Sequence, residues 1–248
     1  NFFKNIYKIY MKYTLNISNI IIVLSQPMKD EISSYFSLKK LKQISKKIHI
    51  LLNFSNNIDK NLFQQREFSP KSIDIIYAGN HGESQSLTSF LRVLIEINPN
   101  EQPSVVFYGE GTDKINVLNF AKKHHLNINF NDPIPKKEII EKISKSKYGL
   151  VCMSESLSRY AFPSKLATYL SSGTKVILCV NGYDYLSDFI KDNEFGYVID
   201  SSDPKSAASN LKKYLKNSKQ SNLNFFHNID HEFNKENYFK KLSKILEL

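Results

Sequence analysis

Short apolar runs alternate with amphipathic stretches from residue 73 onward, and no other feature constrains the fold as strongly. Runs such as Lys-Val-Ile-Leu-Cys-Val are rich in β-branched residues and apolar on both faces, as expected of strands covered on both sides. The predicted strands are Ile73–Ala78, Ser104–Tyr108, Asn127–Phe130, Tyr148–Met153, Lys175–Val180 and Gly196–Ile199. The predicted helices between them cover 84–97, 113–125, 136–146, 163–172, 183–193 and 204–217. Strands and helices that alternate in this way form parallel βαβ units, so the sequence predicts an α/β fold with a doubly wound parallel sheet.

The two ends of the chain follow a different pattern. Apolar and aromatic residues recur at helical spacing over 3–10, with lysines on another face. The sequence next predicts a strand at Ile20–Leu24, a helix near 27–36, a strand at Ile48–Leu52 and an irregular connector over 54–72. The lysines at 39–47 are typical of a solvated face. Near the other end, a Ser- and Asn-rich loop at 218–224 precedes one last amphipathic helix over about 232–247.

The formal net charge of the 248 residues is +10, with a pI of about 9.3. A basic balance suits nucleic acid, an anionic membrane surface or a phosphate-bearing ligand, and the charge alone does not choose among them. No aromatic-and-basic motif of the usual nucleic-acid-binding modules occurs, so we expect no nucleic-acid partner. No apolar run approaches the roughly 18 residues that span a bilayer.

The cysteines and histidines point to neither a disulfide scaffold nor a metal site. Cys152 and Cys179 each lie inside an apolar run, where we expect buried thiols in a reducing, cytoplasmic compartment. The pair His227 and His231 lacks a third ligand, and no other histidine has metal-site spacing, so we expect no metal cofactor. Only His81 lies in a loop expected to face a ligand.

A helix that opens on Pro163-Ser164-Lys165 and closes at Gly173 is the strongest functional signal. A lysine in the first turn is unexpected, because the positive end of the helix dipole disfavours a cation there. The first amides of the helix, a serine hydroxyl and this lysine would gather around an anion such as phosphate. Thr168 shares the same edge of the helix and would reach a sugar hydroxyl one turn further along. The alternative is a solvent-exposed lysine with Ser164 acting only as a cap.

Other strand-to-helix turns carry unusual residues where ligands bind in open parallel sheets. The first strand of the main sheet ends in Gly79-Asn80-His81-Gly82, with Gln85 close behind. The second ends in Gly109-Glu110-Gly111, for which a plain tight turn is an equal alternative to a ligand contact. The third ends in residues 131–135, which would either wall a base pocket or punctuate the turn, and the fourth ends in Ser154-Glu155.

Four landmarks together resemble the C-terminal, nucleotide-sugar-binding half of GT-B glycosyltransferases of family 4. In chain order they are Ser18–Ser25, Ile48–Asn53, Tyr77–Gly82 with Gln85, and Pro163–Gly173, which is similar to a "PSKL…YL…G" segment. The likeness is greatest to enzymes that build bacterial capsule, O-antigen and exopolysaccharide.

This resemblance implies two facing Rossmann-like domains, with the donor held mostly by the second. Residues 1–53 would be the end of an N-terminal acceptor domain that is mostly missing from the sequence shown, and 54–72 the linker. Residues 73–231 would be the donor domain, and 232–248 a helix that crosses back. The resemblance further implies retaining transfer from a nucleoside-diphosphate sugar, with UDP as the expected nucleotide, to a lipid-linked or polysaccharide acceptor. It implies no catalytic metal, and we allow for peripheral association with the inner face of the plasma membrane.

The resemblance also assigns residues to parts of the donor. Gly79, Asn80, Gln85, Ser164 and Lys165 would hold the diphosphate. Asn80 and Gln85 stand where many relatives carry basic residues, which leaves most of the diphosphate charge to Lys165 and the helix amides.

The ribose and sugar would meet a different set of side chains. Many relatives carry two glutamates eight positions apart, and counting back from Gly173 places these positions at Tyr160 and Thr168. A threonine makes one hydrogen bond where a carboxylate clamps two hydroxyls. Arg159 would help with the diphosphate, and Glu155 would replace a missing carboxylate.

We expect Gly109, Ile134 and Pro135 to form the nucleobase pocket. The catalytic residues are unknown, because the acceptor side would supply them. Two alternatives to an active transferase stay open at this point. One is a non-catalytic nucleotide-sugar-binding or scaffold subunit, and the other is a GT-B sugar-nucleotide epimerase.

Overall fold

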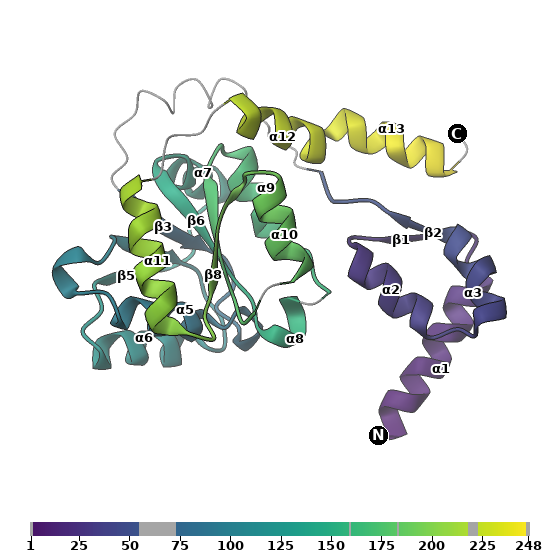
Figure 1. Cartoon of the computed structure of the whole chain (residues 1–248), viewed down its shortest axis with the longest axis horizontal. Helices are drawn as coiled ribbons and strands as arrows, with labels where there is room; N and C mark the ends of the chain where they lie inside the picture. The colour runs from purple at the N-terminus through teal and green to yellow at the C-terminus, as the bar shows by residue number, and fades with distance from the viewer. Residues whose placement is uncertain (1, 55–72, 159, 183, 218–222, 247–248) are drawn as a thin grey trace.

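The computed structural model describes residues 2–54, 73–158, 160–182, 184–217 and 223–246. Its main sheet has six parallel strands in the order β5-β4-β3-β6-β7-β8 (Figure 1). The strands are β3 Ile73–Ala78, β4 Val105–Tyr108, β5 Ile128–Asn131, β6 Ser146–Cys152, β7 Lys175–Val180 and β8 Gly196–Asp200. The predicted α/β class and parallel sheet are therefore confirmed, with strand ends shifted by at most two residues.

The chain order of the strands places a topological switch point at the centre of the sheet. From β3 the chain moves outward to β4 and β5, then returns to pair β6 with the other edge of β3, where Ile76 lies opposite Gly149. The helix that follows β3 and the helix that follows β6 therefore lie on opposite faces of the sheet, and a crevice opens between their starts.

Helices cover both faces of the sheet and form two apolar layers (Figure 1). One layer includes Phe90, Val117 and Leu211, contributed by α5 Leu87–Ile95, α6 Lys114–Lys123 and α11 Pro204–Asn217. The opposite layer is formed by α7 Lys136–Ser144, α9 Ser164–Ser171, α10 Tyr185–Asp192 and α12 Leu223–Phe233. Two short elements, η2 Glu83–Gln85 and α8 Glu155–Ser158, follow β3 and β6. Because both faces are buried, the strands can be apolar throughout, as the sequence indicates.

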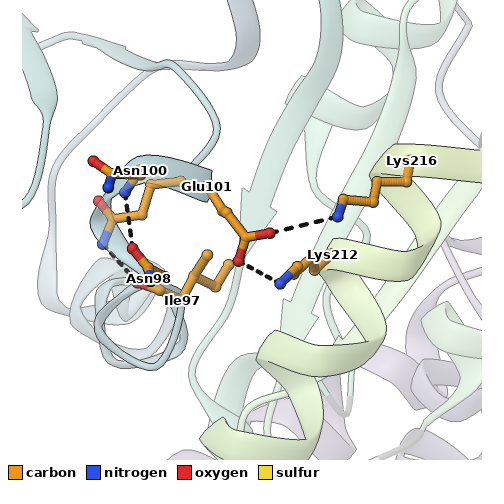
Figure 2. Close-up of polar contacts among 7 residues, drawn as sticks. Ile97, Asn98, Asn100, Glu101, Lys212 and Lys216 are labelled. Atoms are coloured by element: carbon orange, nitrogen blue, oxygen red, sulfur yellow. Dashed lines mark hydrogen bonds and ion pairs between the residues drawn. The ribbon is translucent and has the colours of Figure 1, made fainter.

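A surface ion-pair cluster joins the connection between α5 and β4 to α11 (Figure 2). Glu101, at the end of η3 Pro99–Glu101, lies between Lys212 and Lys216 of α11 and accepts from both ammonium groups. Lys212 holds the pKa of the Glu101 carboxyl below its usual range. The carboxylate is exposed to solvent, so the buried apolar contacts of Leu211 contribute more to the docking of α11 than these pairs do.

The N-terminal segment forms a small unit of its own. Its elements are α1 Phe2–Ile17, β1 Ile21–Val23, α2 Gln26–Ser34, α3 Leu38–Ile44, η1 Ser45–Lys47 and β2 Ile48–Ile50. The two strands are parallel and pack with α1 and α3 around Leu15, Val23 and Ile44. The sequence did not predict α3: the lysines between 39 and 46 are exposed as expected, but they mask the helical spacing of Leu41 and Ile44.

The C-terminal region differs from the single helix predicted at about 232–247. Two helices, α12 and α13 Lys235–Leu246, meet at Asn234, whose side-chain oxygen accepts hydrogen bonds from the first amides of α13. Phe233 ends α12 and is fully buried against the main sheet's helices. The predicted connector and loop fall almost wholly on residues outside the described ranges. Beyond Asn234, α13 reaches the N-terminal segment, where the ring of Tyr238 lies 4.7 Å from that of Phe54 (Figure 1).

The position of α9 on the sheet is set by one aromatic ring. Tyr169 is fully buried, and its ring lies over Gly149 of β6. Its hydroxyl accepts a hydrogen bond from the backbone N–H of Ala78, at the end of β3, at 2.8 Å. Tyr169 therefore ties α9 to two strands at the switch point.

Replacing Gly149 with alanine is expected to lower the free energy of unfolding by roughly 1–3 kcal/mol, since overpacking a buried contact forces side chains to shift. The new Cβ would lie 2.4 Å from the nearest atom of the Tyr169 ring. Urea denaturation followed by circular dichroism measures this change. In a Tyr169→Leu background the same substitution should cost much less, because the overlapping ring is gone. Equal costs in both backgrounds would show that this contact does not position α9.

Candidate functional site

A cavity of about 700 Å³ opens at the carboxyl ends of β3 and β4, beside the start of α9. Eight of the residues predicted from sequence line it: Gly79, Asn80, Gln85, Gly109, Ile134, Ser164, Lys165 and Thr168. Glu110 and Pro133, which belong to turns named in the sequence analysis as candidate ligand contacts, line it too. The sequence did not single out Ala78, Tyr108, Ile139, Ile143 and Tyr169 as ligand contacts, although they also line it. These residues are strand ends and apolar helix positions, whose pattern predicts only core packing.

The Lys165 side chain is largely buried and contacts only neutral partners. Its Nζ donates hydrogen bonds to the Tyr77 hydroxyl at 2.8 Å and to Oε1 of Gln85 at 2.6 Å. The same atom lies 4.2 Å from the centre of the Tyr77 ring, within cation–π range. Burial lowers the pKa of Lys165 to about 8. Within the described ranges no carboxylate forms an ion pair with it, so an anion in the cavity would be its first charged partner.

This geometry excludes the alternative of a solvent-exposed lysine. Ser164 does not cap the helix either: Pro163 is the N-cap residue, and it makes no side-chain capping hydrogen bond. The first amides of α9 have no carbonyl within the helix to bond to, so they are available to an anion. Thr168 lies one turn further along, half-buried, with its hydroxyl donating to the Ser164 carbonyl at 3.4 Å.

The two glycine-containing turns pack against each other, backbone to backbone. A Cβ on Gly109 would lie 1.9 Å from the carbonyl oxygen of Gly79, and one on Gly111 would lie 2.5 Å from that of His81. The backbone N–H of His81 donates to the Glu110 carbonyl at 2.8 Å. These glycines therefore allow the turns after β3 and β4 to lie side by side. Gly79 has φ +149°, and a Cβ there would meet the end of Lys165 at 3.4 Å.

The opposite wall of the cavity is apolar, with one carboxylate at its rim. Ile134 and Tyr108 lie on this side, where a flat ring would find contact. Glu110 is the only acidic residue of the lining in the described chain, and it forms an ion pair with Lys114. Lys114 also pairs with Asp132 at 2.9 Å.

Three predicted site residues that the structure describes are not brought into the cavity. Pro135 is the N-cap residue of α7 and lies outside the lining. Glu155 is exposed in α8 and accepts from Asn181 at 3.4 Å. Tyr160 is exposed, and its carbonyl accepts from the Ser25 hydroxyl of the N-terminal segment at 3.2 Å. Arg159 lies outside the described residues. Glu155 and Tyr160 both follow β6, and neither belongs to the residues that line the cavity.

His81 is buried, contrary to its predicted place facing a ligand. Its ring packs between those of Tyr77 and Phe107, at 5.3 and 5.9 Å between centres. Neither ring nitrogen has a hydrogen bond of ordinary geometry. Burial, together with the charges of Lys114 and Lys165, lowers the pKa of His81, so the imidazole is neutral at pH 7.

No three His, Cys, Asp or Glu side chains come close enough to hold a metal ion, as far as the described chain extends. The same portion contains no helix long and apolar enough to cross a membrane.

Replacing His81 with phenylalanine should raise the free energy of unfolding by about 1 kcal/mol at pH 7, because an apolar ring removes two buried polar atoms without partners. Guanidinium denaturation measures the change. In the wild-type protein, the His81 imidazole takes up a proton more readily in the unfolded state than in the folded state, where its pKa is lowered. The free energy of unfolding therefore decreases as the pH falls through 6.5.

In the His81→Phe variant, the free energy of unfolding should not show this decrease at acid pH. His227→Phe, at an exposed position of α12, is the matched control and should leave both quantities nearly unchanged. A destabilised His81→Phe protein would mean that the ring nitrogens have partners in solution.

Three solved structures illustrate the likeness of the whole chain to known folds. A mutant of the S. aureus protein TarM, in complex with fondaparinux, alpha-GlcNAc-glycerol and UDP, has a TM-score of 0.71 and 17% identity over 96% of this chain and 46% of its own. The pneumococcal O-GlcNAc transferase GtfA, in complex with UDP and GlcNAc, has a TM-score of 0.69 and 14% identity over 96% of this chain and 47% of its own. Anabaena Alr3699/HepE, in complex with UDP and glucose, has a TM-score of 0.70 and 9% identity over 97% of this chain and 67% of its own.

These low identities show the fold, a GT-B glycosyltransferase arrangement, and no more. The chain spans about half the length of the first two proteins and two thirds of the third. No curated protein sequence matches it. Residues 58–228, well over half of the chain, match the family described as glycosyl transferases group 1. The protein is therefore a member of the group 1 glycosyl transferase family.

Proposed function

We propose that the protein serves the transfer of a sugar from a nucleoside-diphosphate sugar, UDP-linked, to a lipid-linked or polysaccharide acceptor. The single observation that carries this proposal is Lys165, a buried cation without a carboxylate partner in the described chain, at the start of α9. The cavity beside it, about 700 Å³, falls within the range of small-molecule sites. Solved proteins of similar fold are in complex with UDP, which supports the choice of nucleotide.

In this proposal the diphosphate lies between α9 and the turn after β3. Lys165 and the first amides of α9 face it from one side, with the Ser164 hydroxyl at the same helix end. Asn80 and Gln85 supply amide groups from the other side. These donors are held in place before the reaction, so they stabilise the charge that develops on the leaving diphosphate. We expect this chemistry to need no metal, because Lys165 and the backbone dipoles of α9 would stabilise the same charge.

The remaining walls suit the other parts of the donor. The nucleobase would lie against Tyr108 and Ile134, beside the Gly109 backbone. Thr168 would make one hydrogen bond to the ribose or sugar, where a carboxylate would make two. We therefore expect weaker ribose recognition than a glutamate at this position would give.

The wider role belongs to the same proposal. We infer a retaining enzyme of family 4 that acts in bacterial surface polysaccharide synthesis, on the cytoplasmic side of the membrane. Its support is the Pro163–Gly173 landmark and the amphipathic pattern of α1. Ile9, Tyr10 and Tyr13 are exposed on one side of this helix, and Lys8 and Lys12 lie on another, a pattern that suits the surface of an anionic bilayer.

Replacing Lys165 with methionine should weaken UDP binding roughly 10- to 100-fold, the usual effect of losing a charge-assisted hydrogen bond. Isothermal titration calorimetry at pH 7 measures this change. Lys175→Met is the matched control, because Lys175 is partly buried too but lies at the amino end of β7, away from the cavity and beside the Phe225 ring. Equal affinity in the Lys165 variant and the native protein would show that the diphosphate does not bind at this site.

The affinity for UDP should also fall as the pH rises through about 8, toward tenfold per pH unit, because only the protonated lysine attracts the anion. The methionine variant should bind weakly and with little pH dependence between pH 7 and 9. A native affinity that stays constant across this range would mean that another group holds the phosphate charge.

A second candidate function is nucleotide-sugar binding without transfer, as in a scaffold subunit. The observation that favours it is the absence of a free carboxylate: of the described residues that line the cavity, only Glu110 is acidic, and Lys114 neutralises it. Incubation with UDP-sugars and analysis of the products separates the candidates. Hydrolysed or transferred sugar indicates an enzyme, an epimerised donor indicates an epimerase, and binding without product supports the scaffold.

A further inference from the structure

The buried Tyr77 hydroxyl joins Lys165 to the turn after β3, which also lines the cavity. Tyr77 lies at the end of β3, fully buried, and does not itself line the cavity. Its hydroxyl donates a hydrogen bond to the backbone carbonyl of Asn80 and accepts one from Nζ of Lys165. The direction of these two bonds matters because it decides which form of the lysine the tyrosine favours.

A phenol hydroxyl has one proton, and the Asn80 carbonyl takes it. The oxygen can therefore only accept a hydrogen bond from Lys165. An ammonium group always supplies a proton for that bond, whereas a neutral amine is a much poorer donor. Tyr77 thus favours the charged form of the lysine through its oxygen, and through the π-face that lies 4.2 Å from Nζ.

The other groups that face the ammonium do not replace this contribution. Gln85 accepts one hydrogen bond, but its amide can turn and offer its NH₂ group instead. His81 is neutral and Cys152 is a buried thiol with a raised pKa, so neither brings a negative charge. Burial raises the pKa of Tyr77 as well, and the phenol stays protonated throughout the working range.

We propose that Tyr77 is a positioning residue that keeps Lys165 charged and directed into the cavity, and thereby sets the range of pH over which the site binds an anion. This inference rests on the proposed function for the identity of the anion. The effect of Tyr77 on the protonation state of Lys165 does not depend on the proposed function, because that state can be measured without a ligand. Because Asn80 also lines the cavity, the same hydroxyl fixes the cation and the facing turn relative to each other.

The test uses Tyr77→Phe, which keeps the ring and removes only the hydroxyl. Titration of ¹³C-labelled lysine by NMR, with the Lys165 signal assigned by its loss in Lys165→Met, should give a midpoint about one pH unit below that of the native protein. Tyr148→Phe removes a buried hydroxyl from β6 on the same sheet, away from the cavity, and should leave the midpoint unchanged. An unchanged or raised midpoint in Tyr77→Phe overturns the proposal.

Binding of UDP to the two proteins gives an independent readout. If the midpoint falls from about 8 to about 7, the ratio of native to variant affinity should widen about fivefold between pH 6 and pH 8. The ratio cancels the titration of UDP itself. A loss of equal size at every pH would indicate loosened structure and overturn the proposal. If native protein does not bind UDP at all, the proposed function fails, and the NMR titration still decides the role of Tyr77.

Discussion

The Tyr169 ring packs on the bare Cα of Gly149, and the position of α9, with the site residues that it carries, depends on that contact. It fixes how closely α9 approaches the sheet, while the hydroxyl of the same residue binds the Ala78 amide at the end of β3. Lys165 lies one turn before Tyr169 on α9, so its side chain is carried over the end of β3 to the hydroxyl of Tyr77. If α9 were held further from the sheet, Lys165 would lie in solvent with the pKa of an ordinary lysine, and its charge would not be directed into the cavity.

The site combines one buried cation with a set of backbone and amide dipoles. Lys165 loses hydration on burial and recovers only neutral partners, which is why its pKa falls to about 8. An anion in the cavity would restore a charged partner and favour the protonated lysine again. The cation is thus held in a state that costs free energy without a ligand and gains most from a negatively charged one, a common property of sites that stabilise charge during a reaction.

Much of the scaffold could be predicted because its strands are short, apolar and separated by clear helical periodicity. The bounds of β3 and β7 were predicted to the residue, and Lys165 was singled out because a cation conflicts with the helix dipole. The errors have physical causes of their own. Lysines hid the apolar spacing of α3, and the break at Asn234 depends on a side-chain cap that periodicity does not reveal. His81 was expected to face a ligand because its loop does, whereas its ring turns into the core.

The sequence by itself determined the class of fold and the strand-to-helix turns at which a ligand could bind, because these depend on local periodicity and on residues adjacent in the chain. Only the tertiary structure decided which side chains meet. It brought Lys165 to Tyr77 and Gln85, which are 88 and 80 positions away, and it left Glu155 and Tyr160 outside the cavity. It also decided the charge balance of the site, since the pKa of a lysine depends on burial and on neighbours that approach across the sheet. Distances of a few ångströms between residues far apart in the chain follow from how helices pack on strands, which local sequence does not encode.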